Sequence, residues 1–281
     1  MQIGEAIRDT AESLQKLLGL DFASASVESN LLCQNVLRVN RAWLISHAND
    51  VLAANHQAVF EALVKRRLNG EPVAYILGSR EFYGLQLKTT SATLIPRADT
   101  ETLVEATLEK IPENLNLNVL DLGTGTGAIA LVIAKNRPHC NVTAVDASSG
   151  ALAVASENAQ ALQLNNVHLI ESNWFSAIKG KKFDVIVSNP PYIAHDDEHL
   201  KQGDLRFEPL SALASGVDGL DDIRKIIKDA PDYLNPNGWL MLEHGYDQAT
   251  AVASLLNARG FRQIEHARDI AGTLRVTFGA I

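Results

Sequence analysis

The stretch VIVSNPPY, residues 185–192, combines a strand pattern with an abrupt stop. Its first residues are apolar and mostly β-branched, which predicts a buried β-strand. Asn189 ends the run, and Pro190 and Pro191 then prevent further strand pairing and stiffen the backbone. We expect a rigid corner that presents the Asn189 amide beside the ring of Tyr192 at the carboxyl end of a strand. In an open α/β sheet, ligands bind at this edge.

The chemistry of this corner suits a planar –NH2 group. The Asn189 side chain offers an acceptor oxygen, and the carbonyl of Pro190 is a second acceptor beside it. Two adjacent acceptors match the two protons of one amino group. The alternative is an ordinary turn that ends a strand, because Asn and Pro are common turn residues. The corner alone does not distinguish these two interpretations.

Apolar strands and helices alternate on both sides of this corner. From Asn118 onward the pattern is typical of a doubly wound α/β sheet. Strands are predicted at residues 119–122, 142–145, 167–170, 183–188, 239–243, 261–265 and 274–278. Helices are predicted at residues 128–135, 151–164, 223–234 and 248–256. The turn residues Arg268, Asp269 and Gly272 favour an antiparallel pairing of the last two strands.

A glycine-rich turn, DLGTGTG at residues 121–127, lies between the first of these strands and a helix. Glycine lets the backbone turn sharply and approach a ligand closely. The Gly-x-Gly-x-Gly spacing differs from the Gly-x-Gly-x-x-Gly of dinucleotide enzymes, and no Lys-Ser/Thr pair follows as in a phosphate-binding loop. The residues of this turn that we expect at a cofactor are Gly123, Thr124, Gly125, Thr126 and Gly127.

Polar side chains also follow the next two strands. Asp146 ends the second strand at the position from which a carboxylate accepts ribose hydroxyls, although an Asp there is also a common helix cap. Asn173 and Trp174 follow the third strand, where an amide and an indole suit the edge and face of an adenine. Trp174 alone would be interpreted as a core ring. Together with Asn189, however, these residues form a more specific pattern than any one of them.

Two regions precede the α/β part. Residues 1–70 carry apolar residues at helical spacing and predict a small helical bundle, which we interpret as a substrate-recognition domain. Residues 71–92 predict a β-hairpin linker, because apolar residues alternate over 73–76 and 82–88. Residues 93–281 are the predicted catalytic domain.

Arg97 lies just before the start of a predicted helix that carries Asp99 and Glu101 in its first turn. Two roles are open for Arg97. It could contact the substrate, or it could be an ion-pair partner of these two acids, which is the commoner fate of an arginine near carboxylates.

Composition restricts the possible classes of protein. The chain has 281 residues, 46% hydrophobic, and a net charge of −8 with a pI near 5.5, which disfavours a broad nucleic-acid-binding surface. Cys33 and Cys140 have no metal-ligand spacing and predict two free thiols in a reducing compartment. No apolar run approaches the length of a membrane span, and the first residues lack the features of a signal peptide. We expect a cytoplasmic protein without membrane contact.

The motifs together resemble those of class I S-adenosylmethionine-dependent methyltransferases. The closer resemblance is to the HemK/PrmC family, the N5-glutamine methyltransferases of peptide chain release factors. It covers nearly the whole chain. The stretches that carry it are 72–78, 82–84, 95–97, 99–101, 121–127, 189–192, 206–209, 242–245 and 268–276. Asn-Pro-Pro-Tyr alone is shared with enzymes that methylate adenine amino groups, whereas the stretches 96–101 and 206–209 favour the glutamine enzymes.

Two positions depart from the family pattern. Ala98 stands where the family usually has a second proline, and Asn173 stands where it usually has an acid. An amide still has a donor and an acceptor for an adenine edge, so we expect cofactor binding to be retained.

The resemblance implies a class I Rossmann-like fold with an antiparallel last strand, and S-adenosylmethionine as the cofactor with no metal. It implies transfer of a methyl group to the glutamine of a Gly-Gly-Gln motif in class I release factors, without direct nucleic-acid binding. The catalytic residues would be Asn189, Pro190 and Tyr192, with Pro191 and Arg97 at the substrate. Open alternatives are an amino-group methyltransferase of DNA or RNA, a glutamine methyltransferase of a ribosomal protein, and a catalytically inactive binding module.

Overall fold

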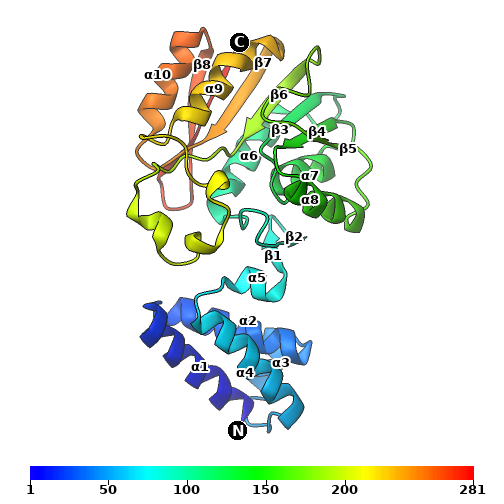
Figure 1. Cartoon of the computed structure of the whole chain (residues 1–281). Helices are drawn as coiled ribbons and strands as arrows, with labels where there is room; N and C mark the ends of the chain where they lie inside the picture. Colours follow the sequence, from blue (N-terminus) through cyan, green and yellow to red (C-terminus); the bar gives the residue numbers. More distant parts are fainter. The chain divides into compact units, whose positions relative to one another are not determined.

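The computed structural model describes residues 1–281, which divide into two compact units (Figure 1). The helical unit comprises residues 1–78 and 201–207, and the sheet unit comprises residues 79–200 and 208–281. The chain therefore leaves the sheet unit at residue 200, contributes a short segment to the helical unit, and returns at residue 208.

The helical unit has a main apolar core and a smaller cluster around Ala11, Leu14 and Ala25. Its helices are α1 (Ile3–Leu18), α2 (Phe22–Leu37), α3 (Arg41–Ser46), α4 (Ala54–Leu68) and α5 (Val73–Leu77). Asp21 caps α2 by accepting the backbone N–H of Ser24, and Asn40 caps α3 by accepting that of Trp43. Residues from all five helices meet in the core, which includes Ile3, Leu32, Leu44, Phe60 and Val73.

The strand predicted at residues 73–76 is wrong, because these residues form the short helix α5. Pro72 is the residue before this helix, and Gly78 ends it in the left-handed conformation with φ 72°. The hairpin is confined to β1 (Ser79–Phe82) and β2 (Leu85–Lys88). A helix of five residues is too short to show a helical period, and its apolar residues were therefore interpreted as the alternation of a strand.

A buried arginine holds the 201–207 segment within the helical unit. The Arg67 side chain is 4% exposed, and its guanidinium lies 2.7 Å from Glu28 and 3.2 Å from Asp204. Its Nη1 also donates to the backbone carbonyls of Gly70 and Glu71. An arginine this deeply buried needs such partners, since an unpaired charge in the interior is costly.

The sheet unit contains one seven-stranded sheet in the order β5-β4-β3-β6-β7-β9-β8. Its strands are β3 (Asn118–Leu122), β4 (Asn141–Asp146), β5 (Val167–Glu171), β6 (Phe183–Ser188), β7 (Leu234–Glu243), β8 (Arg262–Arg268) and β9 (Leu274–Ala280). Strands β3 to β7 are parallel, whereas β9 runs antiparallel to both β7 and β8. The predicted doubly wound fold with an antiparallel last strand is confirmed.

Helices cover both faces of this sheet (Figure 1). The helices of the unit are α6 (Glu101–Lys110), α7 (Ala128–Asn136), α8 (Ser149–Ala161), α9 (Asp221–Asp229) and α10 (Ala249–Arg259). Apolar residues of α6, α7 and α8 share one core cluster with the β1–β2 hairpin, and those of α9 and α10 share the other. Such double coverage explains the apolar central strands β3, β4 and β6, most of whose residues are buried.

The parallel strands end level with one another. Leu122 at the end of β3 pairs with Val145 of β4 and with Ser188 of β6, and Ser188 in turn pairs with Leu242 of β7. The Ser188 hydroxyl also donates to the Leu122 carbonyl at 2.7 Å. The residues that follow these strands therefore emerge at one edge of the sheet.

Strand β7 begins earlier than its sequence suggests. It starts at Leu234 rather than at Trp239, and the register with β6 shifts between Phe183 and Val185. Asn237 adopts φ 63° within this first half. Because the pairing is irregular here, turn-forming residues can lie within the strand.

Both cysteines, Cys33 and Cys140, are free, as predicted, and both are buried. Burial raises the pKa of the Cys33 thiol to about 11, which keeps it protonated and unreactive. None of the helices is both long enough and apolar enough to cross a bilayer.

Replacing Arg67 by Met should lower the free energy of unfolding of the helical unit by about 2–3 kcal/mol, because the partly buried Glu28 and Asp204 lose their partner. Urea unfolding followed by circular dichroism measures this change. The matched control is Arg66→Met, since Arg66 is 45% exposed and pairs only with Glu71, and it should have a much smaller effect. Equal effects of the two variants would contradict the role given to Arg67.

Candidate active site

A cavity of about 380 Å³ lies at the carboxyl edge of the parallel strands, within the sheet unit. Residues from four successive strand ends reach it. From the glycine turn come Gly123 and Gly125, from β4 Asp146, from the loop after β5 Ser172, Asn173 and Trp174, and from the corner after β6 Asn189 and Pro191. The lining is completed by residues 92–94, Ala147, Ser148, Ala151, Pro209, Ser211, Ala212 and Asp222. The glycine turn and the double-proline corner thus share one cavity.

The glycine turn has a left-handed backbone at Gly123, Gly125 and Gly127. A Cβ on Gly127 would lie 3.0 Å from the Leu131 side chain, so close packing as well as φ requires glycine there. Thr124 and Thr126 are buried, and neither they nor Gly127 lines the cavity. Thr124, Thr126 and Gly127, which were predicted at the cofactor, therefore support the shape of the turn without lining the cavity.

Asp121 supports this turn from the interior. It is fully buried, and its Oδ2 accepts the Thr124 hydroxyl at 2.6 Å, whereas Oδ1 has no hydrogen-bond partner. Burial raises the pKa of the Asp121 carboxyl to about 7, opposed by the hydrogen bond from Thr124. The turn was predicted from the sequence, but the raised pKa of this buried carboxyl was not.

Asp146 is oriented by two backbone N–H groups. Gly125 donates to Oδ2 at 2.9 Å and Ser148 donates to Oδ1 at 2.8 Å. The cap of α8 is Ser148, whose hydroxyl oxygen accepts the Ala151 N–H at 3.1 Å, so Asp146 is not the helix cap that its position also allowed. Each carboxylate oxygen keeps a further lone pair, and the residue lines the cavity.

Trp174 lies between the cavity and the core. Its ring packs against one of the two core clusters and faces Gly123, where a Cβ would come within 3.4 Å of the indole. Its Nε1 donates to Asp222 Oδ1 at 3.3 Å, and its own backbone is left-handed with φ 49°. Asn173 is exposed beside it at the cavity. The two interpretations of Trp174, core ring and cavity wall, both describe what it does.

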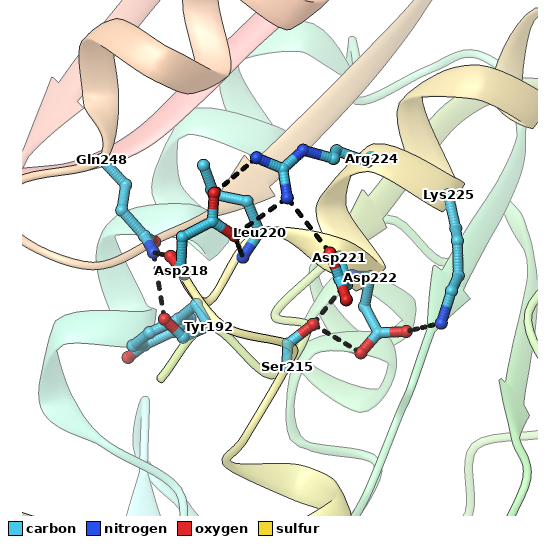
Figure 2. A network of polar contacts seen from close by, with 9 residues as sticks. All are labelled: Tyr192, Ser215, Asp218, Leu220, Asp221, Asp222, Arg224, Lys225 and Gln248. Atoms are coloured by element: carbon cyan, nitrogen blue, oxygen red, sulfur yellow. Dashed lines mark hydrogen bonds and ion pairs between the residues drawn. The ribbon is translucent and has the colours of Figure 1, made fainter. Parts of the chain in front are cut away.

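Asp222 was not singled out from the sequence. It is the second residue of α9, and its Oδ2 accepts the Ser215 hydroxyl at 2.7 Å while Lys225 lies 2.9 Å from Oδ1 (Figure 2). This network fixes the acceptor that Trp174 uses. Acids in a first helical turn are so common that nothing local distinguishes this one.

The Asn189 amide is held by its donor end. Nδ2 donates to Thr100 Oγ1 at 3.1 Å, which leaves the acceptor Oδ1 available. Pro190 is buried behind the corner, whereas Pro191 lines the cavity with Asn189. The corner is therefore fixed from a segment about 90 residues earlier in the chain.

Tyr192 is anchored at both ends. Its hydroxyl donates to Glu243 Oε1 at 3.3 Å. Its backbone carbonyl accepts Gln248 Nε2 at 3.0 Å (Figure 2). Gln248 also donates to the Asp218 carbonyl. A Cβ on Gly219 would lie 2.1 Å from the Tyr192 carbonyl oxygen, so only glycine allows this approach. Burial raises the pKa of the Tyr192 phenol, and neighbouring Glu243 raises it further.

Arg97 pairs with neither Asp99 nor Glu101. Its guanidinium instead forms an ion pair with Glu208, whose other oxygen accepts the Ile95 N–H at 3.0 Å. Asp99 pairs with Arg275, and Glu101 accepts the Tyr83 N–H. The predicted ion pair is thus present with a different partner, because proximity in sequence does not fix which carboxylate an arginine reaches. Arg97 does not line the cavity.

Comparison with known proteins agrees with this geometry. Residues 5–78 match the family profile described as the PrmC N-terminal domain, and residues 98–205 match the Methyltransferase small domain. A crystal structure of a methyltransferase from Pyrococcus furiosus has the same fold, with a TM-score of 0.54 and 20% identity over 81% of this chain and 98% of that one.

Sequence relatives are much closer. The release factor glutamine methyltransferase of Xylella fastidiosa strain Temecula1 is 51% identical over 253 residues, which are 90% of this chain and 92% of that protein. The release factor glutamine methyltransferase of Escherichia coli strain K12 is 44% identical over 252 residues, which are 90% and 91% of the two chains. These relatives confirm the resemblance seen in the motifs: the chain belongs to the HemK/PrmC family, the release factor glutamine methyltransferases.

Proposed function

We propose that this protein transfers a methyl group from S-adenosylmethionine to the side-chain amide nitrogen (N5) of the glutamine in the Gly-Gly-Gln motif of class I release factors. The observation that carries the proposal is the shared cavity. Asp146 and the glycine turn lie at the same cavity as the Asn189 corner, so one small molecule can reach both. The names of the curated relatives support glutamine as the acceptor.

The cavity residues fit S-adenosylmethionine. Asp146 retains a lone pair on each oxygen for the ribose hydroxyls, and Gly123 and Gly125 leave room where a side chain would intrude. Trp174 and Asn173 supply a ring face and an amide for the adenine. When bound, the cofactor supplies a methyl group activated by its positively charged sulfur. The residues proposed at the cofactor are Gly123, Thr124, Gly125, Thr126, Gly127, Asp146, Asn173, Trp174 and Asn189, with Thr124, Thr126 and Gly127 acting through the shape of the turn.

The acceptor glutamine is positioned by the corner. Asn189 Oδ1 and the Pro190 carbonyl each accept one proton of its –NH2 group, which orients the nitrogen. The same two acceptors stabilise the positive charge that develops on that nitrogen. Tyr192 and Pro191 pack against the amide plane. Arg97, oriented by Glu208, is the proposed contact to the rest of the substrate.

Unmethylated release factor, incubated with this protein and S-adenosylmethionine, should gain one methyl group on the glutamine of Gly-Gly-Gln, located by tandem mass spectrometry. Parallel incubations with a ribosomal protein fraction, DNA and RNA test the alternative acceptors. Methylation of nucleic acid, with none on the release factor, would overturn the proposal.

Asn189→Ala should lower kcat by roughly 10²–10³, because an acceptor aimed at developing charge is lost. Initial rates with radiolabelled cofactor measure the change. The matched control is Asn165→Ala, an exposed asparagine outside the cavity, which should keep the wild-type rate. A kcat close to that of the wild type for Asn189→Ala would exclude the proposed role.

Asp146→Ala should weaken S-adenosylmethionine binding by about 10- to 100-fold, since hydrogen bonds to a charged group are lost. Isothermal titration calorimetry gives the affinity. Glu171→Ala is the matched control, because Glu171 is the register neighbour of Asp146 on β5 and lies outside the cavity. If both variants bind as the wild type does, Asp146 is not at the ribose.

A further inference from the structure

A second buried carboxyl stands beside the acceptor corner. Glu243 is the last residue of β7, one position beyond Leu242, which pairs with Ser188, and so it emerges level with Asn189. It is 1% exposed. One carboxylate oxygen accepts the Tyr192 hydroxyl at 3.3 Å, whereas Oε2 has no hydrogen-bond partner.

The groups around Glu243 come from several elements. Burial is the main cause that raises the pKa of its carboxyl, to about 7, and nearby Asp99 adds to this. The Thr100 hydroxyl, the Tyr192 hydroxyl and the Arg275 guanidinium lower it. Arg275 on β9 is shared, since it lies 3.0 Å from Asp99 and 3.0 Å from Asp269.

His244 follows Glu243 in the chain and is fully buried. It bonds the Gly245 carbonyl and the Thr277 hydroxyl, as expected for a structural histidine. Burial lowers the pKa of its imidazole, so it is neutral at pH 7. It therefore adds no charge next to Glu243.

We infer that Glu243 is a positioning residue for methyl transfer, whose ionised carboxylate sets the direction of the hydrogen bonds that hold Tyr192, Thr100 and, through Thr100, the Asn189 amide. The inference rests on the proposed function for its effect on rate.

The direction of these bonds follows from counting protons. Thr100 is buried and its hydroxyl oxygen accepts Asn189 Nδ2, so its single proton remains to be donated elsewhere. Glu243 is the acceptor that the inference assigns to this proton, in keeping with the lowering effect of Thr100 on the pKa of that carboxyl. This arrangement places Nδ2 toward Thr100 and Oδ1 away from it, as the acceptor role of Asn189 requires.

Protonation of Glu243 removes this constraint. A neutral carboxyl can itself donate to Thr100, whose proton would then turn toward Asn189 and favour the flipped amide. The flipped amide presents a donor to a substrate –NH2 group, which is the wrong polarity. The active form therefore contains ionised Glu243, and the rate should rise with pH through about 7 and then level off.

The test variant is Glu243→Gln, an isosteric mimic of the protonated carboxyl. With release factor and S-adenosylmethionine, we expect kcat to fall by about 10- to 100-fold, as for a misoriented reacting group. Cofactor affinity should not change, and the variant's rate should lose the dependence on pH near neutrality. The latter result separates Glu243 from Asp121, whose carboxyl pKa is also raised to about 7.

The unfolding temperature of Glu243→Gln distinguishes a positioning role from a purely structural one, because loss of a structural contact would lower that temperature. The pKa of Glu243 is raised from 4.5 to about 7 by folding, so stability is lost as pH rises through this interval. At pH 8 the Gln variant should then unfold at the same or a higher temperature than the wild type while being less active. Asp184→Asn is the matched control, a carboxylate at the opposite end of β6 that bonds Asn118 and Asn235, and its activity should be unchanged.

Thr100→Val provides a second variant that keeps Glu243. It should show a similar loss of kcat, and adding Glu243→Gln to it should cost little more, because both changes break the same chain of hydrogen bonds. If folded Glu243→Gln or Thr100→Val keeps the wild-type kcat and pH profile, the inference is overturned.

A readout without any acceptor separates this inference from the proposed function. The side-chain amide resonances of Asn189, assigned by their loss in Asn189→Ala, should titrate near pH 7 in the wild type and not in Glu243→Gln. Titration without methylation of release factor would support the hydrogen-bond chain and reject the proposed acceptor. If the wild type methylates release factor but the Asn189 resonances titrate alike in the wild type and in Glu243→Gln, the proposed function would stand and the hydrogen-bond chain would be rejected.

Discussion

The register of the parallel strands is the constraint on which the site depends. Leu122, Val145, Ser188 and Leu242 are paired across four neighbouring strands. The next residue of each strand must therefore lie at the same edge of the sheet, and these residues are Gly123, Asp146, Asn189 and Glu243. A slip of one position in any strand would move its side chains to the opposite face of the sheet and would also displace one wall of the cavity. Backbone hydrogen bonds thus place these polar groups along one edge of the sheet.

The same edge contains groups that oppose stability. Asp121 and Glu243 are fully buried carboxyls, and each has one oxygen without a hydrogen-bond partner. Burial of such groups is unfavourable in their charged form, which is why the pKa of each rises toward neutrality. Asp121 bonds Thr124 in the glycine turn and Glu243 bonds Tyr192 in the corner. Perturbed pKa values of this kind cluster at functional sites.

Much of the fold could be predicted from the sequence because it follows from local pattern. Apolar strand runs, the glycine turn and the double proline each have a direct structural cause, and the parallel sheet then gathers the strand ends. The domain boundaries and the ligand contacts stay predictions. The prediction failed at residues 73–76, where a five-residue helix shows no period of its own. It also missed the start of β7, because Asn237 has the composition of a turn within an irregular strand.

The missed site residues have a different cause. Asp222, Glu208 and Glu243 act through partners that are distant in sequence: Trp174, Arg97 and Tyr192. Nothing near an acid in the chain shows which donor will reach it, since that is settled only by packing. Arg97 illustrates the point, because two nearby acids were available in sequence and a carboxylate 111 residues away is its partner.

The return of the chain to the helical unit at residues 201–207 means that this unit is formed by two separate stretches of the sequence. A protease that cut only after Gly78 would leave two fragments that still share the Arg67–Asp204 ion pair, because Asp204 remains on the larger one. A truncated protein that starts at Ser79 would, conversely, expose a segment whose packing partners had been deleted. The amino-terminal part of this chain is therefore poorly suited to exchange on its own, and a domain swap needs to carry both pieces of the helical unit together.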